Sequence, residues 1–155
     1  MNGLNSLIAR AGEWRGKNLL QDPETNQPEE SVSTLTLTPV LENRFVRAEY
    51  TWQYRGTAQE GCFLIGYEAD TQTISLHWID TWHMGDKVMA CRGIVDARGR
   101  IAARGSYAAG DGPDWGWTIQ IDPGEDQTLR VAMANVAPDG QEYPAVEGLY
   151  SREPA

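Results

Sequence analysis

The feature that most constrains the fold of this chain is a rhythm of short segments in which apolar and polar residues alternate, separated by residues typical of turns. The segment from Phe45 to Arg55 shows this rhythm most clearly. Its apolar face carries Val46, Ala48, Tyr50, Trp52 and Tyr54, and its polar face carries Arg47, Glu49, Thr51 and Gln53. Successive side chains of a β-strand point to opposite faces, so this period of two predicts a strand with one buried face.

The same rhythm predicts about ten strands along the chain. They are Glu13–Leu20, Val32–Val40, Phe45–Arg55, Ala58–Glu68, Ile74–Thr81, Lys87–Val95, Arg100–Tyr107, Trp115–Asp122, Thr128–Ala137 and Gln141–Arg152. The polar stretch from Gln21 to Glu30 contains two prolines and predicts a loop. Asp96 to Gly99 predicts a tight hairpin, because aspartate opens turns and glycine tolerates the left-handed backbone conformation.

The connections between these segments are too short for parallel crossovers, so the sheet must be antiparallel. Ten strands in one sheet usually curl or close, because an open edge exposes unpaired backbone groups. We therefore predict an all-β fold, a single closed antiparallel β-barrel that forms one domain over residues 1–155. Apolar residues with helical spacing also predict a short N-terminal helix within Asn2 to Arg10, capped by Asn5 or Ser6, that plugs one barrel end.

Composition and charge exclude several classes of function. The formal net charge is -9, which disfavours nonspecific binding to nucleic acid or to anionic membranes, since both need a basic surface. Met1 to Arg10 lacks the regions of a signal peptide, and no apolar run approaches the roughly 20 residues of a membrane span. We expect a cytoplasmic protein in which Cys62 and Cys91 are small buried residues. Whether the chain forms homo-oligomers stays open.

The two ends of the barrel segment carry a known signature. Gly12-Glu13-Trp14 in the first strand, with Arg152 in the last, resembles the calycin superfamily, which includes lipocalins and fatty-acid-binding proteins. The resemblance implies that the tryptophan closes the barrel floor and that the arginine packs across it. A cation over an indole face stabilises by about 0.5–2 kcal/mol, so we expect a structural role for this pair.

A closer likeness covers nearly the whole chain. Gly12–Gly16, Asn43–Tyr50, Gly61–Tyr67 and Trp78–Asp80 occur in an order that resembles the bacterial domain-of-unknown-function family 1579. The resemblance implies a calycin-like barrel. It implies no activity, because that family has no established general activity and a fold does not settle function by itself.

Related barrels differ from this chain at the residues that hold their ligands. Nitrobindin-like barrels resemble it at the Gly-x-Trp-x-Gly start, but they place a haem-ligating histidine near the C-terminus, whereas His77 and His83 lie mid-chain. Fatty-acid-binding proteins typically hold a carboxylate with an Arg-x-Tyr pair on the last strand, and Glu147 to Arg152 lacks that pair. Haem is therefore disfavoured, and no cofactor is predicted.

Three charged residues are candidates for orienting a ligand in the lumen. If the aromatic face of Phe45 to Arg55 points outward, Arg47 and Glu49 point into the lumen; if it points inward, they are solvated surface. Alternation alone does not decide which face of this strand points inward, and the resemblance favours a lumen position for Arg47 and Glu49. Asp80 follows three apolar residues on one face, so it is either paired inside, with Arg47 as candidate partner, or caps the turn at Thr81.

Aromatic residues and one histidine complete the predicted binding site. Tyr67, Trp78 and Trp117 are expected to supply apolar wall, since aromatic side chains fill cores or line pockets. His83 lies in the turn after a predicted strand, which places it near a barrel mouth. A zinc site is disfavoured, because the other histidine lies on the strand face opposite Asp80.

Three hypotheses for function follow, and no secure catalytic motif chooses among them. The leading one is a noncatalytic barrel that binds a small, partly apolar ligand in its lumen. The second is an enzyme, such as an isomerase or hydrolase, with Asp80 or Glu49 as base; it requires a carboxylate with a raised pKa inside the cavity. The third is a ligand-free structural or interaction module, which a filled barrel with a broad exposed aromatic patch would favour.

Overall fold

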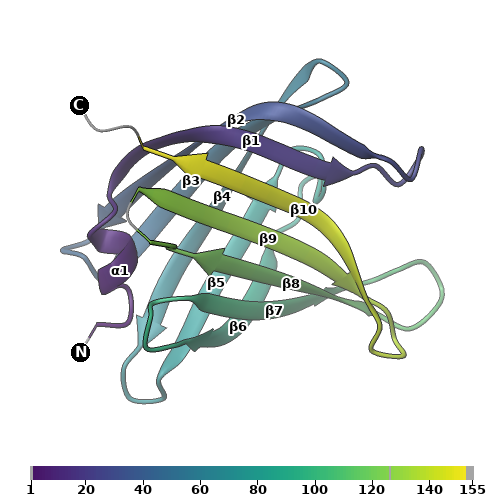
Figure 1. The fold of residues 1–155 in the computed structure, drawn as a ribbon. Coiled ribbons are helices and arrows are strands. Elements are labelled where there is room, and N and C mark those ends of the chain that lie inside the picture. Colours follow the sequence, from purple (N-terminus) through teal and green to yellow (C-terminus); the bar gives the residue numbers. More distant parts are fainter. Residues whose placement is uncertain (1, 126, 153–155) are drawn as a thin grey trace.

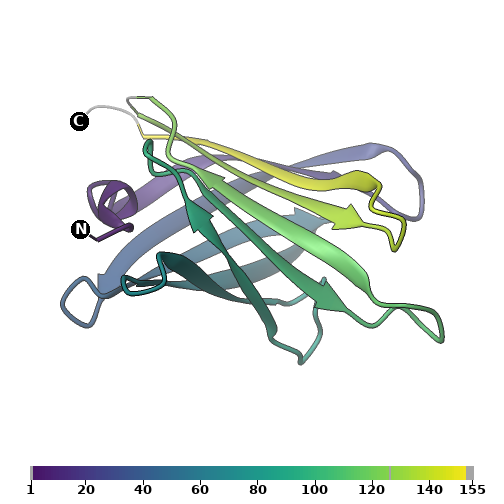
Figure 2. The same ribbon diagram turned by 90° about the horizontal axis from the view of Figure 1, so that it is seen from below.

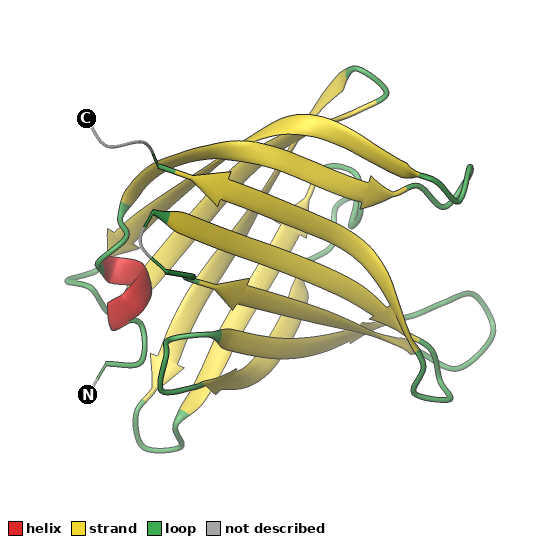
Figure 3. Cartoon of the chain, in the orientation of Figure 1, coloured by secondary structure: helices red, strands yellow, loops and turns green. Residues whose placement is uncertain are grey.

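The alternating segments form strands, and the strands wrap into a closed barrel (Figures 1 and 3). The computed structural model describes residues 2–125 and 127–152, and within them lie one helix and ten strands. They are α1 (Asn5–Ile8), β1 (Gly12–Gln21), β2 (Pro28–Val40), β3 (Phe45–Tyr54), β4 (Thr57–Glu68), β5 (Thr73–Asp80), β6 (Met89–Val95), β7 (Ile101–Tyr107), β8 (Trp115–Asp122), β9 (Thr128–Val136) and β10 (Glu142–Ser151). The predicted fold class is confirmed.

Every strand pairs antiparallel with its neighbours along the chain, and β1 also pairs with β10. The predicted hairpin turn between β6 and β7 is confirmed: the Asp96 carboxylate accepts hydrogen bonds from the backbone N–H groups of Arg98 and Arg100, at 2.9 and 3.0 Å. Gly99 has a φ of 82°, which glycine adopts without strain. The loop predicted over residues 21–30 is shorter than expected, because β2 already begins at Pro28.

The helix is also shorter than predicted, and its cap differs. The N-cap residue is Leu4, and neither predicted cap bonds to the helix start; instead, the Asn2 side chain accepts a 2.9 Å hydrogen bond from the Leu4 N–H. Leu4 and Leu7 are completely buried. They cover one end of the barrel as predicted, and Figures 1 and 2 show α1 at the end opposite the β1–β2 and β9–β10 turns.

The inner faces of the strands fill the barrel centre. Apolar side chains from every strand join one core, and the hollow left among them near Phe63 and Met133 measures about 10 Å³. Such a volume holds at most one water molecule. The centre of this barrel is therefore a packed core, and any larger guest must bind elsewhere.

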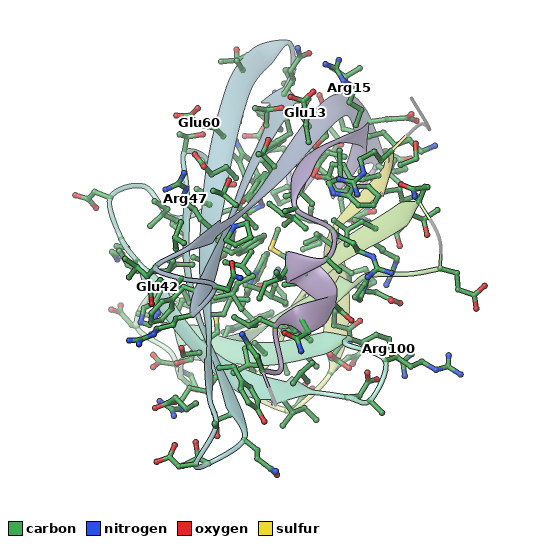
Figure 4. The ribbon with its side chains drawn as sticks, turned by 90° about the vertical axis from the view of Figure 1, so that its left-hand side faces the viewer. Glu13, Arg15, Glu42, Arg47, Glu60 and Arg100 are labelled. Carbon is green, nitrogen blue, oxygen red and sulfur yellow. The ribbon has the colours of Figure 1, made fainter. Side chains whose placement is uncertain are left out.

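The face of β3 that points inward is the aromatic one, so the lumen position predicted for Arg47 and Glu49 is wrong. Their side chains are 47% and 52% exposed and form a 2.7 Å ion pair with each other on the outer surface. Figure 4 shows Arg47 on the outer side of the barrel wall. Burying the opposite face, which includes Tyr50 and Trp52, removes far more apolar area from water, at about 25 cal/mol per Å².

Both cysteines are free thiols, and only Cys91 is fully buried; Cys62 is partly exposed. No helix in the described part of the chain has the length and apolar character needed to cross a membrane.

The ends of the barrel wall meet at Trp14 and Arg152, as the signature predicts. The Arg152 guanidinium lies 4.7 Å from the centre of the Trp14 ring, and its Nη1 donates a 2.6 Å hydrogen bond to the carbonyl of Ala11. The indole N–H of Trp14 donates to the carbonyl of Arg10 at 2.9 Å. These contacts tie the last strand to the segment that leads into the first one.

Replacing Arg152→Ala should lower the free energy of unfolding by about 1 kcal/mol, because it removes both the cation–π contact and the hydrogen bond to Ala11. Urea unfolding followed by tryptophan fluorescence measures the change. Arg98→Ala is the matched control, since Arg98 is an exposed arginine in the β6–β7 turn. Equal stability of the two variants would contradict a role for Arg152 in closure.

Candidate functional site

A buried carboxylate organises one end of the barrel. Asp80 is the last residue of β5, and its side chain is fully buried. Its Oδ2 accepts hydrogen bonds from the hydroxyl of Tyr50 at 2.5 Å and from the indole N–H of Trp52 at 3.3 Å. Its Oδ1 accepts bonds from the backbone N–H groups of Trp82 and His83 at 2.7 and 2.8 Å.

The predicted pairing of Asp80 with Arg47 is wrong, because the arginine lies on the outer side of the barrel wall. The other interpretation, a cap for the turn that begins at Thr81, is correct: Oδ1 binds the backbone of that turn. An uncompensated buried carboxylate is costly, and here five donated hydrogen bonds compensate it, the fifth from the ring Nδ1 of His83 at 3.1 Å.

The environment keeps Asp80 ionised. Burial acts to raise the pKa of this carboxyl, but the hydrogen bond and charge of His83 and the hydroxyl of Tyr50 outweigh it, so the pKa lies below its ordinary value. Burial and the neighbouring Asp80 charge raise the pKa of Tyr50 well above its ordinary value. An ionised carboxylate only accepts hydrogen bonds, so the Nδ1 atom of His83 carries a hydrogen and Nε2 is the nitrogen left for other partners.

These positions weaken the enzyme hypothesis in its predicted form. That hypothesis requires a carboxylate inside a cavity with a raised pKa. Asp80 lies inside but has a lowered pKa, and Glu49 lies on the outer surface.

Four indole rings surround the imidazole of His83. The ring centres lie 4.8 Å away for Trp82, 5.4 Å for Trp78, 5.5 Å for Trp52 and 5.8 Å for Trp117. Trp78 and Trp117 stack on one another at 5.2 Å with an angle of 9° between their planes. The Asp80 carboxylate and the four aromatic rings therefore hold the His83 side chain in place, and this side chain is only 11% exposed.

Two nitrogen atoms in this cluster are buried without a hydrogen-bond partner among the described residues. They are Nε2 of His83 and Nε1 of Trp117. Native proteins leave few buried polar atoms unpaired, and each costs about 1–3 kcal/mol, so a pair in one wall requires an explanation.

A pocket of about 780 Å³ lies against this cluster and opens to solvent at the barrel mouth. It is lined by Trp78, Trp82, His83, Met84, Lys87, Val88, Met89, Ala90, Ser106, Tyr107, Ala108, Trp117 and Asn135. The barrel wall makes room for it. The ladder between β6 and β7 runs only from Arg92 opposite Arg104 to Val95 opposite Ile101, so the mouth-side residues 89–91 and 105–107 are not paired with one another.

The structure brings together four of the seven predicted site residues: Trp78, Asp80, His83 and Trp117. Arg47 and Glu49 lie outside the wall, as described above. Tyr67 is separated from the rest, because it lies on β4 near Gly3, at the end covered by α1.

Sequence reasoning missed Trp82, Tyr107 and Asn135, which line the same pocket. Their common signal is position: each lies at or near the mouth end of its strand. Tyr107 donates a hydrogen bond to Oδ1 of Asn135. Alternate strand ends meet at the same end of an antiparallel barrel, so counting from strand ends would have found them.

Other parts of the described chain offer less to a ligand. A hollow of about 560 Å³ on the outer wall lies over β1, β8, β9 and β10, but two of its three charged residues, Arg130 and Glu147, already pair with each other at 2.7 Å. Within residues 2–125 and 127–152, no group of three or more His, Cys, Asp or Glu side chains is placed to hold a metal ion. His77 is exposed on the outer face of β5, opposite Asp80, as predicted.

The fold and the site define a closed antiparallel β-barrel with a filled centre and a pocket at one mouth. The chain matches the family described as "Protein of unknown function (DUF1579)" over residues 5–152, and it belongs to that family, which confirms the resemblance seen in its sequence. No match was found among curated proteins.

A solved structure is similar over almost the whole chain. It is titled "Crystal Structure of Rv2717c from M. tuberculosis", has 12% sequence identity and a TM-score of 0.61, and the match covers 98% of each chain. At this identity the likeness supports the barrel fold alone.

Replacing Asp80→Asn should lower the free energy of unfolding by roughly 2–4 kcal/mol, because an amide oxygen cannot satisfy five donors and its NH₂ group faces them. The loss should disorder the turn after β5, seen as a red shift of tryptophan emission. Asp86→Asn, an exposed aspartate of the same connection, is the control and should change neither quantity. A fully stable Asp80→Asn protein would contradict the central role of this carboxylate.

Replacing Tyr50→Phe should lower the free energy of unfolding by about 1–3 kcal/mol near neutral pH, because the hydroxyl bridges the Trp78 indole N–H and Asp80. The raised pKa means that folded Tyr50 keeps its proton while the unfolded residue loses it above about pH 10. Wild-type stability therefore falls with rising pH there, by about 1.4 kcal/mol per pH unit for this group.

Tyr50→Phe lacks this component of the pH dependence, so its deficit against wild type should shrink as the pH rises above 10. Urea unfolding at several pH values from 9 to 11 measures the difference. A deficit that stays constant over that range would show that Tyr50 ionises alike in both states.

Proposed function

We propose that this protein binds a small, partly apolar molecule in the pocket at the barrel mouth. Two unpartnered nitrogen atoms carry this proposal, Nε2 of His83 and Nε1 of Trp117, because both belong to aromatic residues that line that pocket. Small-molecule sites are mostly apolar hollows with a few fixed polar groups that orient the ligand. The mouth pocket has this composition, and the filled barrel centre does not have the space.

The energetics favour a ligand with a polar group at one end. Each unpaired buried nitrogen destabilises the free protein by about 1–3 kcal/mol, and a ligand atom that bonds to it recovers that energy on binding. The Asp80 and tryptophan contacts hold the His83 ring in place before the ligand arrives. Less conformational entropy is then lost on binding.

The hypothesis of a ligand-free interaction module has less support. It requires a broad exposed aromatic patch, and among the described residues Tyr143 is the only aromatic one with a large exposed area, at 45%. The exposed aliphatic residues, such as Val32, Leu41 and Ile94, lie on separate strands and turns. Isolated exposed apolar residues are ordinary on soluble proteins.

The proposed setting is the cytoplasm, where free thiols such as Cys62 and Cys91 persist. The proposed partner is the small molecule alone, with no cofactor and no nucleic acid. The net charge of -9 supports this choice.

Blocking the mouth should abolish binding. The neutral probe N-phenyl-1-naphthylamine should fluoresce more strongly with wild-type protein, and Ala90→Trp should weaken its affinity at least about tenfold by placing a bulky ring on the pocket lining. Ala102→Trp is the matched control, because Ala102 is an exposed alanine on β7 that does not line the pocket. Native mass spectrometry of protein from its host should show a bound small molecule.

Two results would overturn the proposal. One is the absence of probe binding by wild-type protein together with a host-purified protein of bare chain mass. The other is equal probe affinity in Ala90→Trp and Ala102→Trp, which would place the probe elsewhere.

A further inference from the structure

Three free hydrogen-bonding groups of the mouth pocket are donors. Nε1 of Trp117 can only donate. The amide oxygen of Asn135 already accepts the bond from Tyr107, so its NH₂ group is the part left for a ligand. Lys87, on the pocket rim, donates as well and forms no ion pair with the described residues.

The side chains that line the pocket differ in charge from the rest of the protein. The chain has 22 acidic and 13 basic residues, yet the 13 residues that line the pocket include no aspartate or glutamate. Lys87 is the one lining residue with a full positive charge. A pocket free of acidic side chains in so acidic a protein favours a ligand that is itself negative.

The carboxylate behind His83 holds the ring in place beside these donors, because Nδ1 of His83 donates to Asp80. A carboxylate group of the ligand would meet a charge-assisted hydrogen bond from Lys87, which is stronger than a neutral one.

We infer that the mouth pocket binds an apolar molecule with a carboxylate head group, and that Trp117, Asn135 and Lys87 recognise that group. This inference rests on the proposed binding function and names the class of its ligand. The indole rings of Trp78 and Trp82, with Met89, contact the apolar body of the molecule. Flat aromatic bodies suit this wall, so an aromatic carboxylate is the simplest member of the class.

Two probes of one shape separate charge from apolar contact. 2-Naphthoate and 2-naphthamide differ in the head group alone, and calorimetric titration at low ionic strength gives the affinity of each. Wild-type protein should bind the naphthoate at least about tenfold more tightly than the naphthamide. The ratio should fall as salt is added, because salt screens the exposed charge of Lys87.

Variants assign the effect to named residues. Lys87→Met and Trp117→Phe should each reduce the ratio of naphthoate to naphthamide affinity severalfold. The chain offers a matched control for the first: Lys17→Met replaces its other lysine, which lies outside the pocket. If Trp117→Phe fails to fold, Lys87→Met and the wild-type ratio still decide.

The outcomes distinguish this inference from the function on which it rests. Naphthamide that binds as tightly as naphthoate, or variants that leave the ratio unchanged, would overturn the anionic ligand class while pocket binding stands. Failure of both naphthyl compounds and of N-phenyl-1-naphthylamine would overturn the binding function and the inference together. If naphthoate binds Ala90→Trp as tightly as it binds the wild-type protein, its site lies outside the mouth pocket. That result also overturns the inference.

Discussion

The pairing of β1 with β10 is the constraint on which the rest of this structure depends. It joins Arg15 opposite Ser151 through Leu20 opposite Val146, and it turns a ten-stranded sheet into a barrel. Closure gives backbone hydrogen-bonding partners to both strands that would otherwise be edges. Closure also creates a single interior, so the apolar face of every strand must point into the same core. The contact of Arg152 with Trp14 strengthens this junction with side chains.

The closed fold was largely predictable from the sequence, because the features that lead to it are local. Alternation, turn residues and short connections are local properties, and they were enough for ten strands in antiparallel order. The errors lie where local pattern has two solutions. Alternation in β3 defines two faces but does not by itself say which is inside, and the apolar area of Tyr50 and Trp52 decides the outcome against Arg47 and Glu49.

The site was half predicted for a related reason. Trp78, Asp80, His83 and Trp117 have the residue types and turn positions of a site, and they meet at the mouth. Tyr67 has a suitable residue type but lies at the other end of the barrel. The position of a side chain along the barrel axis depends on the register of its strand, which residue type alone does not reveal. The hydrogen-bond partners of Asp80 could not be predicted from the sequence either, since Tyr50 and Asp80 are thirty residues apart and meet only after β3, β4 and β5 pair.

The two ends of the barrel differ in how they are covered. One end is covered by Leu4 and Leu7 of the helical segment, and the centre is filled. At the other end the ladder between β6 and β7 stops at Arg92, and the exposed gap is backed by a rigid layer of indole rings over Asp80. Unpaired backbone and unpaired buried nitrogen atoms both cost stability, and here they occur together, beside His83. Destabilising features that coincide with a rigid aromatic wall are typical of a surface shaped for a ligand rather than for packing.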